Sequence, residues 1–404
     1  MHILRLKIGL YCPDNDRLMF SKTAFLFKLA TIGSALVALL AMGSGCSKHS
    51  AQPAPSQTSF SVALGPEQNV IPPASPGLLY SPDEHFSYLR NAGGSFNMWF
   101  SADAGTVGFS TPDLLNLSPL KSANGAPSPL LAPSGAGTTA FDADYAGSGS
   151  IFTAANGKDL LMIYHAENHL FGSVHSNGNP FYAGIGLARS TDGGITWQRE
   201  GQVLSAHDPQ LASQTSGGAG IATPAAIEAN GYIYVLFREI DPQSNIEGIG
   251  IARALISSDA VAGSWQKFLN GSYSSPGLGG AFTPLQVTLD INANADHRQP
   301  FVTFNTYLNS YVLVIVGNGG IYICTSKDLV TWTAGQVILP APVPDATVTP
   351  STAPYNWYPT LVSPDQPSEI LTDNTGYLYY AKGANDGTSH HTMYRRSFTL
   401  SLTP

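Results

Sequence analysis

The sequence predicts an all-β fold, a five-bladed β-propeller, and three observations support this prediction. The 404 residues include 43% hydrophobic but only 11% charged side chains, which is enough apolar material for a large core. Glycine and proline are abundant, with 41 and 29 residues, as expected for many turns between short strands. Five stretches of the chain share one pattern of apolar strands and turns, which indicates a repeat architecture.

A targeting segment precedes the predicted fold. Two lysines flank the start of an apolar run over residues 29–42, which is short for a membrane span and ends in Gly43-Ser44-Gly45-Cys46. Small residues before a cysteine resemble the bacterial lipoprotein signal, in which the cysteine is lipidated. We therefore predict a signal segment over 1–45, a lipidated Cys46 and a place in the cell envelope, on the outer-membrane or periplasmic side. Plain secretion or an uncleaved anchor is the alternative, and Met19 is an alternative start.

Residues 46–59 are rich in Ser, Gln, Pro and Ala, and we expect them to form a flexible tether. Beyond the signal segment the chain has only Cys46 and Cys324, so neither a disulfide framework nor a cysteine metal site is available. The net charge of −8 provides no basic surface for nucleic acid. We expect a monomer without a cofactor, which binds carbohydrate and touches a membrane only through its N-terminal lipid.

The predicted domain covers residues 60–404 and contains five units. Each unit has an apolar strand, a turn with Gly or Asn, a second strand that ends in polar residues, and often a third strand. The units, with their continuations, cover residues 81–114, 148–204, 222–265, 298–332 and 358–400.

A physical constraint explains this repetition. One four-stranded sheet cannot bury both of its faces alone, so such sheets stack radially as the blades of a propeller. Five units therefore imply five blades, and we expect the strand at residues 59–64 to complete the last blade beside the C-terminal strand. A β-sandwich is the alternative.

Two turns carry a resemblance to known propellers. The segment STDGGITW from Ser190 resembles the Asp-box turn of sialidase-type propellers, and TSKDLVTW from Thr325 resembles a turn of five-bladed glycoside hydrolases of the arabinanase, xylosidase and levanase type. The resemblance covers most of residues 75–400 and implies a propeller that acts on carbohydrate. Short acidic side chains accept backbone N–H bonds across such turns. We therefore expect a scaffold role for Ser190, Asp192, Trp197, Ser326, Asp328 and Trp332.

The resemblance also implies where a ligand binds. In these families the innermost strand of each blade begins at the ligand face and the second strand ends there, so side chains at those positions converge near the axis. This chain places acids, histidines and aromatic residues at such positions, although it has few charges overall. We expect catalytic carboxylates at Asp144, Glu167 and Glu239, and substrate-binding side chains at Asp83, Asp103, His165, His169, Arg238, Arg298, Tyr145, Trp357 and Tyr358.

Glycoside hydrolysis needs one protonated carboxyl to assist the leaving group and a second carboxylate that acts as base or nucleophile. Glu167 follows the apolar strand LLMIY, so we expect its pKa to be raised and assign it as the general acid. We assign Asp144 as the base or nucleophile, and Glu239 as a residue that orients the substrate or tunes the acid. A purely structural hydrogen bond, or an ion pair with arginine, is the alternative for each acid.

The sequence departs from the resembling families at one informative place. The arabinanase-type enzymes carry an acid directly before a small residue or proline at the start of particular first strands. Those positions here hold a non-acidic residue before proline: Ser81, Thr223, Gln299 and Tyr358. The catalytic residues of the family therefore cannot be carried over. Two interpretations stay open, an exported glycoside hydrolase that cleaves a poly- or oligosaccharide, and a noncatalytic carbohydrate-binding or assembly lipoprotein.

The run YHAENH also permits a metal site. On a strand, His165, Glu167 and His169 would point to the same side and offer two imidazoles and a carboxylate to a transition metal. The spacing is not that of a strong zinc signature. We therefore expect no metal here and assign the three side chains to substrate binding or acid/base chemistry.

Overall fold

Strands dominate the part of the chain that the structure describes. The computed structural model describes residues 59–71, 75–103, 105–135, 137–169, 181–207, 218–241, 246–289, 298–317, 320–341, 354–384 and 391–403. The predicted signal segment, Cys46 and all but the last residue of the tether lie outside these ranges. Within them the helical content is the short 3₁₀ turn η1 (Ile256–Ser258), which confirms the all-β prediction. None of these ranges holds a helix with the length and apolarity to cross a membrane.

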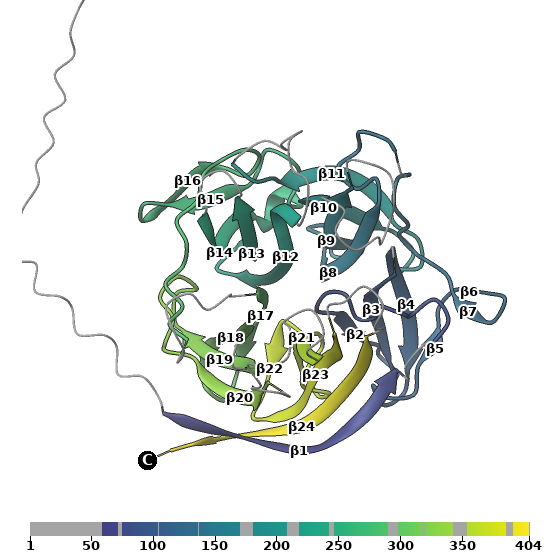
Figure 1. The fold of residues 1–404 in the computed structure, drawn as a ribbon, viewed down its shortest axis with the longest axis vertical. Coiled ribbons are helices and arrows are strands. Elements are labelled where there is room, and N and C mark those ends of the chain that lie inside the picture. The colour runs from purple at the N-terminus through teal and green to yellow at the C-terminus, as the bar shows by residue number, and fades with distance from the viewer. Residues whose placement is uncertain are drawn as a thin grey trace, which may run out of the picture. The chain divides into compact units, whose positions relative to one another are not determined.

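The strands fall into five antiparallel groups of four, which follow one another around a ring (Figure 1). We name these groups blades one to five and give their strands from the inside outward. Blade one is β2 (Ser87–Arg90), β3 (Phe96–Ala102), β4 (Gly105–Thr111) and β5 (Ser118–Pro119). Blade two is β8 (Tyr145–Thr153), β9 (Leu160–Asn168), β10 (Phe181–Ser190) and β11 (Gln198–Leu204).

Blade three is β12 (Gly218–Ala229), β13 (Tyr232–Asp241), β14 (Ile246–Leu255) and β15 (Gln266–Leu269), extended by β16 (Ser272–Pro276). Blade four is β17 (Arg298–Asn305), β18 (Ser310–Gly317), β19 (Gly320–Ser326) and β20 (Gln336–Pro340). Blade five is β21 (Pro354–Val362), β23 (Thr375–Ala384), β24 (Thr392–Leu402) and β1 (Phe60–Ile71). Two short additions are the hairpin of β6 (Ser122–Ala123) with β7 (Ala126–Pro127), and β22 (Leu371–Thr372), which runs parallel to β17.

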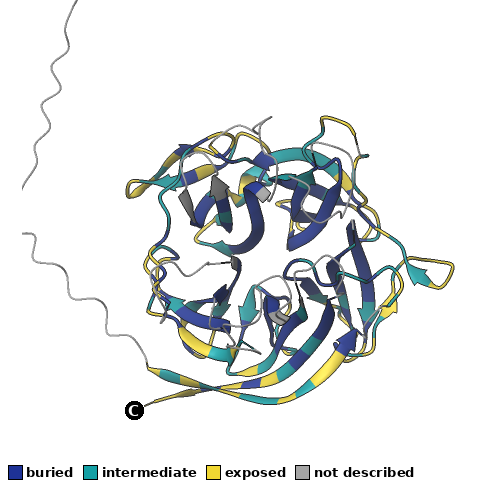
Figure 2. Ribbon diagram, in the orientation of Figure 1, coloured by how far each residue is buried: buried dark blue, intermediate teal, exposed yellow. Residues whose placement is uncertain are grey.

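The core lies between the blades. In the described residues it divides into five apolar clusters, and each cluster joins the facing sides of two neighbouring blades. For example, Ile163 of blade two packs with Phe237 of blade three, and Phe86 of blade one packs with Tyr379 of blade five. The five interfaces together close a ring, which is consistent with the five predicted blades and differs from the two packed sheets of a sandwich. Figure 2 shows that the inner strands of the ring are mostly buried, whereas exposed residues lie along its outer rim.

The two ends of the described chain close the ring together. Strand β1 pairs with β24 along its whole length, from Phe60 opposite Leu402 to Ile71 opposite Met393. The carboxylate of Glu67 on β1 contacts Lys382 and Arg396 of blade five and accepts a hydrogen bond from the Tyr380 hydroxyl. The expectation that the strand at residues 59–64 completes the last blade is confirmed.

A buried acid makes a second connection between the first and last blades. Glu369, in the segment before β22, accepts hydrogen bonds from the Ser87 hydroxyl at 2.6 Å and from the Tyr88 backbone N–H at 3.1 Å. Burial raises the pKa of this carboxyl to about 7. The contact ties the innermost strand of blade one to a loop almost 300 positions later in the chain.

The acidic turns have the scaffold role expected of them. Asp192 Oδ1 accepts the backbone N–H groups of Ile195 and Thr196 at 3.1 and 3.0 Å. Asp328 Oδ1 does the same for Val330 and Thr331 at 2.9 and 2.7 Å. The indole N–H groups of Trp197 and Trp332 both donate to backbone carbonyls within their own turns. These bonds satisfy backbone N–H groups of the turns that would otherwise need water as a hydrogen-bond partner.

Candidate functional site

The innermost strands of blades three, four and five share an uncommon backbone feature. The residues Thr223, Gln299 and Tyr358 have φ values of 51°, 56° and 51°, a region that non-glycine residues seldom occupy. Each precedes a proline and lies at a bulge where the register of the strand shifts. Strained positions of this kind persist where the surrounding structure holds them, and they gather at functional sites.

The bulges direct backbone and side-chain groups toward one another across the blades. The Tyr358 N–H of blade five donates to the Gln299 side-chain carbonyl of blade four at 3.1 Å. The Tyr358 hydroxyl donates to Asp83 Oδ1, beside blade one, at 3.0 Å. The Thr223 N–H of blade three lies 3.1 Å from Nδ1 of His165 in blade two. All five blades therefore contribute to one polar region, which we call the axial cluster.

An alternating chain of acids and histidines forms the centre of this axial cluster. His165 Nδ1 lies 2.8 Å from Glu84 Oε1, and His165 Nε2 lies 3.0 Å from Glu167 Oε1. The other oxygen of Glu167 lies 2.7 Å from His169 Nε2. Glu84, His165 and His169 are buried, whereas the Glu167 side chain keeps 17% of its surface exposed. The prediction that His165, Glu167 and His169 share one side of the strand is confirmed.

His165 carries a positive charge in this arrangement. Burial alone would lower its pKa, but Glu84 and Glu167 outweigh burial and raise the pKa to about 10. The two contacts of Nδ1 compete, because a protonated nitrogen cannot accept the Thr223 N–H. The carboxylate at 2.8 Å prevails over the amide at 3.1 Å, since a charge-assisted hydrogen bond is roughly twice as strong as a neutral one.

The pKa of Glu167 corrects our assignment of the acid. Its burial would raise the pKa, but hydrogen bonds and charges from His165 and His169 lower the pKa to about 2. The expectation of a raised pKa was wrong because it considered the apolar strand before Glu167 and not the two imidazoles that flank it. Glu167 is therefore ionised at neutral pH, which does not suit a general acid.

Asp83, which we assign to substrate binding from the sequence, is a protonated carboxyl of the axial cluster, and burial also raises the pKa of its neighbour Glu84. Burial raises the pKa of Asp83 to about 8, with further contributions from the charges of Glu167 and Glu84. Hydrogen bonds from the hydroxyls of Tyr358 and Tyr145 lower the pKa of Asp83, but by less than burial raises it. Asp83, Glu167 and Tyr358 are half-buried, so this edge of the cluster is reached by solvent.

Asp144 lies beside Glu167, as its assignment requires. Asp144 Oδ2 accepts the backbone N–H of His169 at 2.7 Å, and its own N–H donates to the Glu167 carbonyl at 3.0 Å. Its other oxygen, Oδ1, is buried and has no hydrogen-bond partner among the described residues. Its role as base or nucleophile stays a prediction. The neighbouring Asp142 points elsewhere, to Arg199 and the Tyr164 hydroxyl.

Glu239 makes its strong contacts in a different place. One oxygen lies 3.1 Å from the ammonium group of Lys267 on β15, and the other accepts the His207 N–H at 2.9 Å. Lys267 lies on the outer strand β15 of blade three, and His207 lies in the segment that follows β11, the outer strand of blade two. Glu239 and Lys267 are fully buried as an ion pair, so these contacts fit a structural role better than the predicted role in catalysis.

The contacts of three of the remaining predicted side chains lie in the inner part of blades one, two and five. Trp357 stacks on Tyr358 and on His391, with ring centroids 6.0 and 6.1 Å apart, and is itself nearly buried. Tyr145 packs edge-on against His165 at 5.6 Å. Asp103 ends β3 and accepts the Tyr80 N–H at 3.1 Å. Their roles in substrate binding stay predictions, as do those of two arginines: Arg238 is half-buried at the end of β13, and the side chain of Arg298 lies outside the described residues.

The sequence led us to give no catalytic or binding role to Glu84, Thr223, Gln299 or His391. Glu84 directly follows Asp83, Thr223 and Gln299 lie at the bulges of β12 and β17, and His391 directly precedes β24. The signal in the sequence is the proline that directly follows Thr223, Gln299 and Tyr358 in the inner strands of blades three, four and five. The departure from the resembling families thus marked a geometric feature of the site.

A metal is not needed to explain this cluster. The Nε2 atoms of His165 and His169 are both taken up by Glu167. Among the residues that the structure describes, no group of three or more His, Cys, Asp and Glu is arranged to hold a metal ion.

No protein-family model and no curated protein matches the sequence. Among solved structures the chain is similar to a protein of unknown function from Dyadobacter fermentans, with 13% identity and a TM-score of 0.47 over 84% of this chain and 99% of that one. It is also similar to the catalytic domain of the Coprinopsis cinerea GH62 α-L-arabinofuranosidase, with 12% identity and a TM-score of 0.47 over 87% and 100% of the chains. A third similar structure is the endo-1,5-α-L-arabinanase of Thermotoga petrophila, with 10% identity and a TM-score of 0.48 over 82% of this chain and 76% of that one. Similarity at this level does not determine the activity of this chain.

Replacing His165 with Gln tests the charge at the centre of the axial cluster. At pH 6.5 we expect the free energy of unfolding to fall by about 3–5 kcal/mol, because Glu84 and Glu167 lose their shared cation. The folded pKa of about 10 lies above the ordinary value of 6.5, so the stabilisation is full below pH 6.5 and is lost as the pH rises to about 10. Urea unfolding at pH 6.5, 8 and 10 should show the gap between wild type and variant narrowing. The exposed His207, changed to Gln, is the control, and a gap that stays constant with pH would contradict the charge assignment.

Proposed function

We propose that this chain hydrolyses glycosidic bonds in a neutral poly- or oligosaccharide. The observation that carries the proposal is a pair of half-buried carboxyls, Asp83 and Glu167, whose pKa values of about 8 and 2 are driven apart within one cluster. At neutral pH one is protonated and the other ionised. Environments that separate two carboxyls in this way identify the acid and the base of a hydrolytic site.

Asp83 is the proton donor in this mechanism. Its carboxyl proton passes to the glycosidic oxygen while the bond to the anomeric carbon breaks, so the leaving sugar departs as an alcohol. Tyr358 holds Asp83 through the hydroxyl hydrogen bond at 3.0 Å. The half-exposed edge formed by Asp83, Glu167 and Tyr358 is where the scissile bond would lie.

Glu167 is the second carboxylate in this mechanism, in the role of base or nucleophile that the sequence led us to expect of Asp144. It either takes a proton from the attacking water or attacks the anomeric carbon itself, and in the second route water then releases the sugar. His165 and His169 hold its two oxygens at 3.0 and 2.7 Å, which keeps the side chain ionised and oriented. Glu84 contacts the other nitrogen of His165. Glu84 therefore orients His165, and His165 in turn orients Glu167.

A noncatalytic carbohydrate-binding protein is the second candidate. One observation favours it: both oxygens of Glu167 already have imidazole partners, as in a structural network. The position of Asp83 favours the hydrolase, because its raised pKa lies at the edge of the cluster that solvent reaches, whereas the structural acid Glu369 is buried. Half-buried Tyr358 could support a sugar ring in either case.

The acid and base roles make distinct kinetic predictions. On a substrate found in a panel of arabinan, xylan and levan, we expect Asp83→Asn and Glu167→Gln each to lower kcat by about 100-fold or more. An aryl glycoside with an acidic leaving group needs little protonation, so it should restore much of the rate to Asp83→Asn but not to Glu167→Gln. The exposed Asp365→Asn is the matched control. Hydrolysis of every panel member by Asp83→Asn at the wild-type rate would remove the proposed mechanism.

The pH profile follows from the same two carboxyls. Asp83 is protonated below its pKa of about 8, so kcat/KM should be level at neutral pH and fall as the pH rises through about 8. The Tyr358 hydroxyl lowers this pKa by stabilising the ionised form, so Tyr358→Phe should move the alkaline limb to higher pH. Tyr307→Phe, a change on an exposed turn, should leave the limb in place. A limb that moves to lower pH in Tyr358→Phe contradicts the assignment.

We further propose that the protein is exported and held in the cell envelope by a lipid on Cys46. The support is the apolar run that ends in Gly43-Ser44-Gly45-Cys46, followed by a tether rich in small and polar residues. Cys46→Ala should abolish incorporation of labelled fatty acid and move the protein from the membrane fraction to the soluble fraction. Unchanged fractionation of the variant would show that Cys46 is not the anchor.

A further inference from the structure

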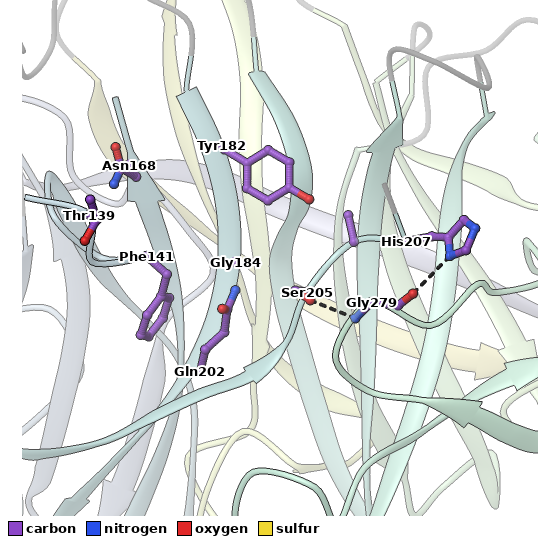
Figure 3. Close-up of a pocket in the computed structure, with 10 residues that line it drawn as sticks. Thr139, Phe141, Asn168, Tyr182, Gly184, Gln202, Ser205, His207 and Gly279 are labelled. Atoms are coloured by element: carbon purple, nitrogen blue, oxygen red, sulfur yellow. Dashed lines mark hydrogen bonds between the residues drawn. The ribbon is translucent and has the colours of Figure 1, made fainter. Parts of the chain in front are cut away.

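A second cavity lies on blade two, away from the axial cluster. It has a volume of about 390 Å³ and is shown in Figure 3. Its lining includes aromatic, amide, hydroxyl and imidazole side chains from β9, β10, β11 and the segments beside them, among them Phe141, Asn168, Tyr182, Gln202, Ser205 and His207. We call it the blade-two pocket.

The blade-two pocket and the axial cluster occupy opposite faces of the same pair of strands. On β9, Glu167 and His169 belong to the cluster, and Asn168 between them lines the pocket. On β10, Tyr182 pairs with Asn168 and also lines the pocket, whereas the ring of Phe181 stacks on His169 at 5.5 Å. Because side chains alternate across a strand, the two sites are separate.

A buried ion pair behind the pocket holds two of the residues that line it, Ser205 and His207. The Lys267 ammonium group donates to the carbonyls of Ser205 and Gly280 at 2.7 and 2.8 Å, and its partner Glu239 accepts the His207 N–H at 2.9 Å. The Ser205 hydroxyl accepts the Gly279 N–H at 2.9 Å. A fully satisfied buried charge pair fixes the groups around it, so the 205–207 segment is held in a defined position.

The lining matches a neutral ligand with many hydroxyl groups. Among the described residues that line the pocket there is no Asp, Glu, Lys or Arg. Asn168 uses its NH₂ group on the carbonyls of Thr138 and Ala140, which leaves its carbonyl oxygen to accept. The Gln202 amide makes no hydrogen bond to the described residues and provides both a donor and an acceptor at the pocket. Phe141 and Tyr182 add flat apolar surface.

The floor of the pocket depends on a glycine. A Cβ atom at Gly184 would lie 2.4 Å from Gln202 Nε2 and 3.4 Å from Phe141 Cδ2. A methyl group there would therefore displace the Gln202 amide and occupy the space between it and Phe141. The absence of a side chain at this position keeps the cavity open.

We propose that the blade-two pocket is a second, noncatalytic carbohydrate-binding site, which takes a neutral sugar unit of the same polysaccharide that reaches the axial cluster. The ligand class rests on the proposed function, while the location and the residues rest on the pocket itself. Glu239 is then a positioning residue of this site, through its contacts with Lys267 and the His207 N–H.

Affinity electrophoresis of the full chain in gels that contain arabinan, xylan or levan tests the proposal, in an Asp83→Asn background so that the matrix is not hydrolysed. We expect at least one polysaccharide to retard the protein, and Gln202→Ala and Gly184→Ala to weaken this binding about fivefold, the loss of about one hydrogen bond. Gln266→Ala, an exposed glutamine on β15, is the matched control and should bind like its parent. Thermal unfolding checks that all variants fold equally well.

The outcomes separate this proposal from the proposed hydrolase. In an otherwise wild-type chain, Gln202→Ala should cleave a short chromogenic glycoside at the wild-type kcat/KM, because such a substrate fills only the axial site. If a polysaccharide retards the wild type in the gel but the wild type cleaves no substrate, the proposed hydrolase is wrong and the proposed second binding site still stands. Folded Gln202→Ala and Gly184→Ala variants that are retarded like the parent, or a parent that no polysaccharide retards, overturn the second site.

Discussion

Every feature of this protein depends on the burial of two apolar faces per blade. A four-stranded sheet with apolar residues on both faces has no stable place in water unless a neighbour covers each face. The five core clusters show that each blade obtains this cover from the blades on its two sides. The ring must therefore close, and the pairing of β1 with β24 completes its last blade.

Closure also concentrates polar chemistry at the inner strands. The starts of these strands approach one another, so groups from all five blades meet although they are far apart in sequence. Tyr358 reaches Asp83, and His165 reaches both Glu84 and the backbone of Thr223. The cost is visible in the left-handed φ values of three non-glycine residues and in buried acids that need imidazole partners. The apolar interfaces between the blades supply the stability that offsets this strain.

The sequence predicted those parts of the structure that repeat or alternate. The strand and turn pattern predicted the fold, and the period of two along β9 placed His165, Glu167 and His169 on one side. The pKa of Glu167 could not be predicted in this way, because it depends on two imidazoles at hydrogen-bond distance rather than on the apolar residues before it. The contacts of Glu239 could not be predicted for a similar reason: its counter-ion Lys267 comes from β15, and nothing local in the sequence pairs the two. Long-range ion pairs determine the site, and they follow only from the closed ring.

The pairing of β1 with β24 has a consequence for the order of events during synthesis. Strand β1 is the first part of the blades to leave the ribosome, but its partner is among the last segments to be made. Among the described residues the closing contacts therefore join positions more than 300 residues apart, such as Phe60 and Leu402, and contacts of this kind form late. Until they form, blade five presents an open edge at β24 and the ring is incomplete. A chain with this topology stays short of its native state until its last strand has been made, so partly synthesised chains expose blade faces that the finished ring covers.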